Sequence, residues 1–156
     1  MDTKGLVRDG HLFRGNRDKE VLNFISVEDL IEKDIATVSP ETNLLQLTDI
    51  ISKTKRGIFP VIDSSRKLLG IIVLNSIRKI LFELENYENL PVIELMSQPA
   101  AVIEIGEDIH SVMGKFDSTG LWALPVVDKG IFEGYISRAD VLVKYRNQLK
   151  ALYPNE

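Results

Sequence analysis

The sequence contains no cysteine and only two histidines, His11 and His110, which stand far apart. The absence of cysteine excludes disulfides and thiolate metal sites, and two distant histidines are too few for a histidine-based zinc site. We therefore expect no metal centre. The chain also lacks a Ser-His-Asp set within plausible reach and a glycine-rich phosphate loop that ends in lysine. These absences argue against an enzyme.

An excess of positive charge and a long apolar run are also missing. The 156 residues carry 19 Lys and Arg against 23 Asp and Glu, a formal net charge of -4, with both signs mixed along the chain. A nucleic acid or an anionic membrane needs a basic face, so neither is expected as the main partner. No apolar stretch approaches the roughly 20 residues of a membrane-spanning helix, and the first nine residues lack the apolar core of a signal peptide. The chain itself is therefore expected to be soluble and cytoplasmic.

An internal repeat organises what is present. Residues 60–63, Pro-Val-Ile-Asp, recur 65 positions later as Pro-Val-Val-Asp at 125–128. A series of apolar positions upstream keeps the same offset, and an offset of 64 relates Gly70 to Gly134. The two sequence repeats cover approximately residues 27–81 and 92–145.

Within each repeat, the apolar pattern predicts the order β-α-β-β-α. Leu44, Leu47 and Ile51 recur at helical spacing, and the short apolar runs that flank each Pro-Val are typical of strands. A unit this small cannot bury both faces of its sheet alone, whereas two copies packed sheet to sheet about a pseudo-twofold axis can. The expected fold class is therefore α+β, close to α/β, with two such repeats.

The expected elements of the first repeat end with a helix that Asn75 or Ser76 caps. Their ranges are 27–32, 37–38, 44–51, 58–62, 69–74 and 77–84, and those of the second repeat are 95–96, 102–103, 109–116, 124–127, 132–137 and 139–149. The expected domains are an N-terminal linker segment at residues 1–26, the first repeat at 27–85 and the second at 92–149, in one compact pair.

The residues around each repeated glycine resemble a known family. Residues 134–140, Gly-Tyr-Ile-Ser-Arg-Ala-Asp, resemble the CBS-domain signature of a glycine, two apolar residues, Thr or Ser, two variable residues and Asp. Residues 59–63 and 70–76 show the same frame in the first repeat. The chain thus resembles a CBS pair, or Bateman module. The resemblance implies a non-catalytic regulatory module that binds an adenine nucleotide (ATP, ADP or AMP) and forms homodimers.

The flanking sequence resembles a narrower group. Residues 16–22, Asn-Arg-Asp-Lys-Glu-Val-Leu, and residues 27–34 are similar to the segment that joins the last membrane helix of bacterial CLC-type chloride channels to their cytoplasmic CBS pair. This resemblance implies a C-terminal regulatory domain at the cytoplasmic face of the inner membrane. Its partner would be the CLC-type membrane domain of the same full-length chain.

Ser137 and Asp140 are the first candidates for ligand contacts. Ser137 ends the last expected strand and Asp140 opens the next helix, so their spacing directs a hydroxyl and a carboxylate into one crevice. A carboxylate accepts both hydroxyls of a ribose, and a serine hydroxyl bonds a sugar or phosphate oxygen. The first repeat has Val73 and Ser76 at the matching positions. We therefore expect one nucleotide per chain.

The family resemblance adds residues from the first repeat. It implies that strand residues surround the adenine, and on this chain those positions are Thr37, Val38, Gly57, Ile58 and Pro60. The alternative walls come from the second repeat and are Val102, Trp122, Ala123 and Pro125. The candidates for phosphate contacts are Arg56, Arg78 and Arg138.

Each of these residues also has a structural interpretation. Asp140 can complement the helix dipole, Ser137 can be a strand-end hydroxyl, and the arginines can be solvated. Phe59 and Trp122 are expected to be core or interface aromatics rather than adenine stackers. The main functional hypothesis is a ligand-sensing module that modulates an attached chloride channel or transporter. The alternative is a ligand-free module that dimerises and assembles a membrane transporter.

Overall fold

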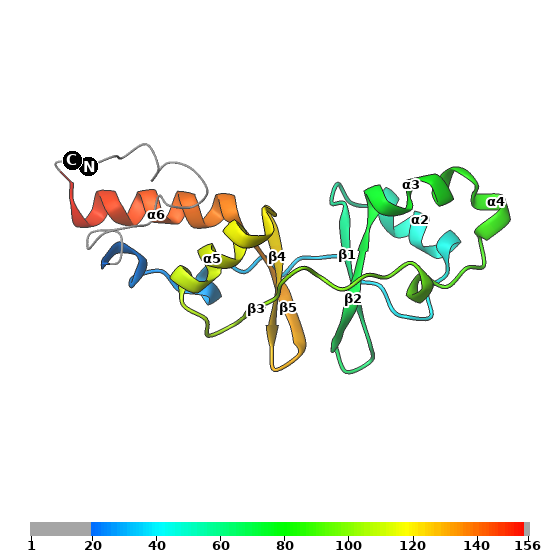
Figure 1. Cartoon of the computed structure of the whole chain (residues 1–156), viewed down its shortest axis with the longest axis horizontal. Helices are drawn as coiled ribbons and strands as arrows, with labels where there is room; N and C mark the ends of the chain where they lie inside the picture. Colours follow the sequence, from blue (N-terminus) through cyan, green and yellow to red (C-terminus); the bar gives the residue numbers. More distant parts are fainter. Residues whose placement is uncertain (1–19, 155–156) are drawn as a thin grey trace. The chain divides into compact units, whose positions relative to one another are not determined.

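The computed structural model of the chain describes residues 20–154. The chain divides into two compact units. Within the described residues, unit 1 comprises 20–33, 100–128 and 133–154, and unit 2 comprises 34–99 and 129–132. Each unit has its own sheet (Figure 1). Each also has its own cluster of buried apolar side chains.

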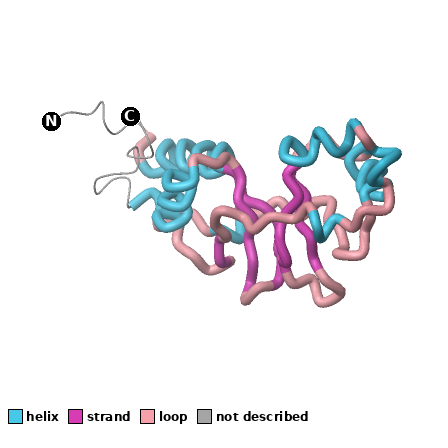
Figure 2. Tube along the Cα trace, turned by 45° about the vertical axis from the view of Figure 1, so that its right-hand side comes forward, coloured by secondary structure: helices cyan, strands magenta, loops and turns pink. Residues whose placement is uncertain are grey.

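Unit 2 is built on an antiparallel hairpin, in which Phe59 of β1 lies opposite Ile72 of β2. Both side chains are buried with Leu44 and Leu47 in the centre of the core. Helices α2 and α3 lie on one side of the hairpin in both views (Figures 1 and 2). The elements are α2 (Leu44–Ser52), β1 (Ile58–Ile62), β2 (Leu68–Val73), α3 (Leu74–Phe82), α4 (Leu84–Tyr87) and the 3-10 turn η4 (Val92–Glu94).

Unit 1 contains a three-stranded sheet in the order β3-β4-β5, in which β3 runs parallel to β4. Helices α5 and α6 lie on one side of this sheet (Figures 1 and 2), and Phe116, Leu124 and Ile136 are buried in its core. The first two residues of β5 belong to unit 2. The elements are the 3-10 turn η3 (Val27–Asp29), β3 (Ile103–Glu104), α5 (Ile109–Thr119), β4 (Ala123–Asp128), β5 (Ile131–Ser137) and α6 (Arg138–Leu152).

These elements confirm the mixed α+β class that the apolar pattern predicts. In each repeat, an extended segment is followed by a helix, two neighbouring strands and a second helix. No helix among residues 20–154 is both long enough and apolar enough to cross a bilayer.

Pro40 explains why the first repeat has only an isolated bridge where the second has β3. Val38 bridges Val61 in parallel, and the Val38 N–H donates to the Pro60 carbonyl at 2.9 Å. Continuing this ladder beyond Val38 would require an N–H on Pro40, and proline has none. In the second repeat Ile105 takes the place of Pro40, and its N–H donates to a β4 carbonyl at 2.9 Å.

Helix α3 begins at Leu74, three residues earlier than the sequence predicts. The prediction that Asn75 or Ser76 caps this helix is wrong, because the N-cap is Val73, which makes no side-chain cap bond. The Leu74 N–H instead donates to the backbone carbonyl of Gly57 at 2.8 Å. A main-chain acceptor therefore satisfies a helix-end donor that a cap side chain usually bonds.

Each unit contains the beginning of the other sequence repeat. Val27 opens the first repeat but is buried in the core of unit 1, and Val92 opens the second repeat but is buried in the core of unit 2. The Glu32 backbone exchanges two hydrogen bonds with Tyr135 of β5, at 2.7 and 3.0 Å. Ser97 pairs in the same way with β2, at 2.8 and 2.9 Å. The compact units therefore differ from the sequence repeats in where these opening segments pack.

The packing of these opening segments explains why each signature has a glycine. A Cβ atom built on Gly134 would lie 2.3 Å from the Glu32 carbonyl oxygen. One built on Gly70 would lie 2.4 Å from the Met96 side chain and 2.8 Å from the Ser97 carbonyl oxygen. Gly134 also has φ of 150°, where side chains are rarely found. A backbone that passes directly over the strand thus excludes any side chain at these two positions.

Candidate functional site

The eight residues predicted to contact a nucleotide divide between the two units. Three belong to unit 1 and five to unit 2. The structure brings some of the residues within each group together. That the two groups form one site stays a prediction. The unit 1 residues are Ser137, Arg138 and Asp140, and the unit 2 residues are Thr37, Val38, Gly57, Ile58 and Pro60.

Ser137 and Asp140 meet at the junction of β5 and α6. Ser137 is the N-cap of the helix, and its Oγ accepts a hydrogen bond from the Asp140 N–H at 3.0 Å. Asp140 occupies the first turn, where its carboxylate complements the helix dipole. Both residues therefore have the structural role that the sequence leaves open for them. The Ser137 hydroxyl still has its own hydrogen to donate to a ligand.

Asp140 also lines a pocket of about 260 Å³ within unit 1. Lys144 and Asn147 share this pocket, because residues four and seven positions after Asp140 lie on the same side of a helix. Asp29 adds a second carboxylate from the turn η3. Sequence reasoning missed these three residues, although the helical spacing from Asp140 is a signal for two of them. Leu30, Ile31 and Val143 complete the lining.

Arg138, the first residue of α6, is held by contacts to two residues. Its N–H donates to the Trp122 carbonyl at 2.8 Å, and its guanidinium carbon lies 5.5 Å from the centroid of the Trp122 ring. Its Nη2 lies 3.0 Å from Asp117 Oδ1, with the two side chains 19% and 26% exposed. Arg138 is therefore ion-paired rather than solvated.

The two aromatics that the sequence places in a core or an interface differ in the structure. Phe59 is 1% exposed and lies in the core of unit 2, which confirms the prediction. Trp122 is 66% exposed and contributes to neither core among the described residues. Of the other candidate arginines, Arg78 donates from Nη2 to Asn75 Oδ1 at 2.7 Å.

In unit 2, Thr37 and Val38 line a pocket of about 490 Å³. The Pro60 carbonyl accepts the Val38 N–H, so these three predicted residues lie together. Gly57 and Ile58 lie where β1 begins, at the opposite end of the strand from Ile62, and they do not line this pocket. The remaining lining residues are Ser39, Pro40, Glu41, Ile62, Asp63 and Ser64.

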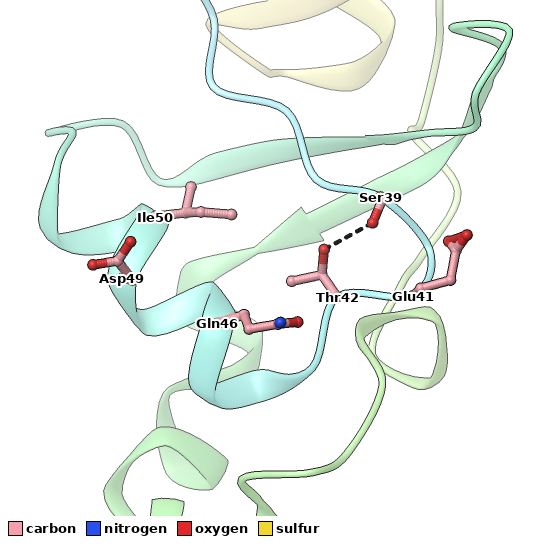
Figure 3. Close-up of a pocket in the computed structure, with 6 residues that line it drawn as sticks. All are labelled: Ser39, Glu41, Thr42, Gln46, Asp49 and Ile50. Atoms are coloured by element: carbon pink, nitrogen blue, oxygen red, sulfur yellow. Dashed lines mark hydrogen bonds between the residues drawn. The ribbon is translucent and has the colours of Figure 1, made fainter.

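A neighbouring pocket of about 470 Å³ lies along α2 and the loop before it (Figure 3). The hydroxyls of Ser39 and Thr42 are hydrogen-bonded at 3.0 Å across its floor, as the dashed line shows. Asp49 of this pocket pairs with the exposed Lys53 at 3.1 Å. Among the described residues, two carboxylates and no cation line this pocket, so it disfavours a phosphate. The other lining residues are Glu41, Gln46 and Ile50.

One carboxylate of unit 1 has a shifted pKa. Burial raises the pKa of the Glu107 carboxyl, but hydrogen bonds from the Ser111 hydroxyl, the Glu104 N–H and the Lys115 ammonium lower it more. The pKa of Glu107 therefore lies below its usual value. This network connects the loop after β3 to α5. None of its residues lines the pocket beside Asp140. No group of three or more acidic or histidine side chains in residues 20–154 is arranged to hold a metal ion.

The family model of the CBS domain matches residues 17–83 and 87–147. The chain belongs to the CBS domain family. Both matched segments contain a Pro-Val strand followed by a signature glycine, so the pair of CBS repeats that the sequence predicts is confirmed. None of the relatives named below is a chloride channel.

Relatives of this CBS pair include nucleotide-binding proteins. The cyclic di-AMP receptor B of Bacillus subtilis (strain 168) is 29% identical over 129 residues, which cover 79% of this chain and 87% of the receptor. The crystal structure of CbpB in complex with c-di-AMP matches with a TM-score of 0.73 at 16% identity, over 88% of this chain and 95% of CbpB. That of CBSX2 in complex with AMP matches with a TM-score of 0.63 at 23% identity, over 80% and 98%. The two structures show the same fold.

The chain spans about a quarter of the length of the enzymes that it matches. An inosine-5'-monophosphate dehydrogenase of Aquifex aeolicus is 33% identical over 118 residues, which cover 73% of this chain and 24% of the enzyme. A homoserine O-acetyltransferase of Methanococcus vannielii is 25% identical over 123 residues, 78% of this chain and 25% of the enzyme. These likenesses concern CBS domains, so the activity of the enzymes does not transfer to this CBS pair.

Proposed function

We propose that this CBS pair is a regulatory module that binds an adenine nucleotide, with Ser137 and Asp140 contacting the ribose. The observation that carries the proposal is the couple of hydroxyl and carboxylate at the start of α6, with Asp140 lining a pocket of unit 1. A carboxylate accepts two ribose hydroxyls, and the serine hydroxyl can donate to a third oxygen. The relatives that bind c-di-AMP and AMP support an adenylate as the ligand class.

The first repeat supports one binding site per chain rather than two. Val73 stands at the N-cap position of α3, where it offers no hydroxyl, and Ser76 is an exposed residue at the position of Asp140. A serine accepts fewer hydrogen bonds than a carboxylate and carries no charge. The equivalent cleft of the first repeat thus lacks the group on which the proposal depends.

Isothermal titration calorimetry with AMP and c-di-AMP tests the proposal. Asp140→Asn removes the charge but keeps the size of the side chain, and Ser76→Ala is the matched control in the other repeat. Hydrogen bonds to charged groups contribute about 1.5–3 kcal/mol, so Asp140→Asn is expected to weaken binding roughly 10- to 100-fold. Ser76→Ala should leave the affinity and a stoichiometry of one unchanged. Equal affinities of the wild type and Asp140→Asn would contradict the proposal.

The second candidate function is a ligand-free module that holds subunits together. The observation that favours it is that Ser137 and Arg138 already have structural partners, in the cap of α6 and in the ion pair with Asp117. This candidate predicts no binding heat with AMP, ATP or c-di-AMP for the wild-type chain. The calorimetry above therefore distinguishes the two functions.

The attachment to a CLC-type chloride channel rests on the resemblance of residues 16–22 and 27–34 alone. Residues 16–19 lie outside the described residues. This attachment, the cytoplasmic face of the membrane and the homodimer all stay predictions. In such an assembly, differential nucleotide binding to two states of the module would shift the activity of the attached domain, with a coupling of typically 1–3 kcal/mol.

A further inference from the structure

We infer that Asp117 sets the charge preference of the nucleotide site, so that the ligand is an adenylate of low charge, a monophosphate or a phosphodiester, rather than a triphosphate. The inference rests on the proposed function and narrows its ligand class. It follows from the way in which the charges around the start of α6 are already paired within unit 1.

Arg138 is the cation that stands between the two proposed ribose contacts, in the first turn of α6. A free guanidinium in that place would favour several phosphate oxygens. Here the Arg138 side chain forms an ion pair with Asp117 at 3.0 Å, and neither side chain is more than 26% exposed. The pair leaves the cation largely neutralised before any ligand arrives.

The Trp122 ring keeps Arg138 beside Asp117. The guanidinium carbon lies 5.5 Å from the centroid of this ring, and the Arg138 N–H is bonded to the Trp122 carbonyl. Attraction between a cation and an aromatic face adds to the ion pair. A guanidinium that moved toward a distant phosphate would lose both the ion pair with Asp117 and the contact with the Trp122 ring. This loss disfavours a long polyphosphate.

The other charged side chains near Asp140 also disfavour a ligand that carries several negative charges. Within residues 20–154, the lining of the pocket beside Asp140 includes a second carboxylate, Asp29, and one ammonium, Lys144. Each further phosphate group would add negative charge close to these carboxylates, and like charges repel each other. A ribose and one phosphate charge suit this balance better than a triphosphate.

The test compares adenosine, AMP, c-di-AMP and ATP by calorimetry without magnesium. For the wild-type chain, ATP is expected to bind no more tightly than AMP. Asp117→Asn keeps an oxygen that accepts from Arg138 but removes the charge, so AMP should bind about two- to fivefold more tightly, the size of a weak ion pair. The gain for ATP should be at least as large, and the affinity for adenosine should not change. Asp128→Asn is the control, because it removes one charge from an exposed residue of the same unit.

Two results would overturn the inference while leaving the proposed function intact. The first is that the wild-type chain binds ATP at least tenfold more tightly than AMP. The second is that the ratio of AMP affinity to adenosine affinity is the same in Asp117→Asn as in Asp128→Asn. Unchanged adenosine affinity and thermal unfolding of the variants show that they are folded. If the wild-type chain binds none of the four compounds, the proposed function fails first and the inference fails with it.

Discussion

The two signature glycines acquire their meaning from the backbone that passes over them. Gly134 lies beneath the Glu32 carbonyl, and Gly70 beneath Met96 and Ser97. In the sequence these glycines look like parts of a family motif. In the structure each is a position where an opening segment of one repeat crosses a strand of the other repeat within one compact unit.

Gly134→Ala should destabilise the chain, because its Cβ would meet the Glu32 carbonyl oxygen and φ of 150° disfavours a side chain. Overpacking of this kind costs about 1–3 kcal/mol of unfolding free energy. Gly114→Ala is the matched control, since nothing lies within 4 Å of its Cβ and it is exposed on α5. This control should gain roughly 0.5–1 kcal/mol from helix propensity. Urea unfolding of the three chains measures both effects, and a Gly134→Ala variant as stable as the wild type would contradict the packing described here.

At the same scale, the sequence predicted the candidate site in part. Ser137 and Asp140 lie together as the motif indicates, and a helix cap joins them. The pairing of Arg138 with Asp117 was beyond the sequence, because 21 positions separate the two residues and no periodic pattern relates them. Asp29 was missed for the same reason, as its pocket forms only when the opening segment packs on α6.

At the scale of elements, the strands were predictable because proline, glycine and apolar runs act locally. The ranges of β1, β4 and β5 differ from the prediction by at most one residue at each end. The start of α3 was not predictable, because the acceptor for its first N–H is a main-chain carbonyl at Gly57 rather than a neighbouring side chain. A sequence shows which residues can cap a helix through their side chains. It does not show which backbone carbonyl accepts a hydrogen bond from the first helical N–H.

The junction between β3 and α5 depends on the ionised Glu107. Hydrogen bonds that favour the charged form hold the pKa of Glu107 below its usual value of 4.5. The pKa in the folded state is thus lower than in the unfolded state, so this carboxylate stabilises the fold fully above the unfolded pKa. The contribution is lost as the pH falls through the folded pKa.

Glu107→Gln should therefore lower the unfolding free energy at pH 7, and the difference from the wild type should shrink as the pH falls below about 4.5. Thermal or urea unfolding between pH 3 and pH 7 measures it. Glu104→Gln is the control, since it changes a neighbouring exposed carboxyl. A Glu107→Gln penalty that stays the same across this pH range would show that packing, rather than the charge, holds the junction.

At the scale of the whole molecule, the duplication was readable from the sequence, but the partition into units was not. Val27 and Val92 occupy equivalent positions in two similar repeats, and both repeats offer an apolar core of the same kind. Self-similarity cannot say on which copy an opening segment packs, because both copies present matching residues. The strand pairings of Glu32 and Ser97 decide the matter in the structure.

The proposed function depends on a contact between Asp140 and the ribose of the ligand. The most direct measurement is a crystal structure of the chain grown with AMP. We predict that the 2'- and 3'-hydroxyl oxygens lie about 2.6–3.2 Å from the Asp140 carboxylate oxygens, the range of a hydrogen bond. A structure in which AMP binds elsewhere, while Asp140 contacts only protein or solvent, would contradict the proposed function.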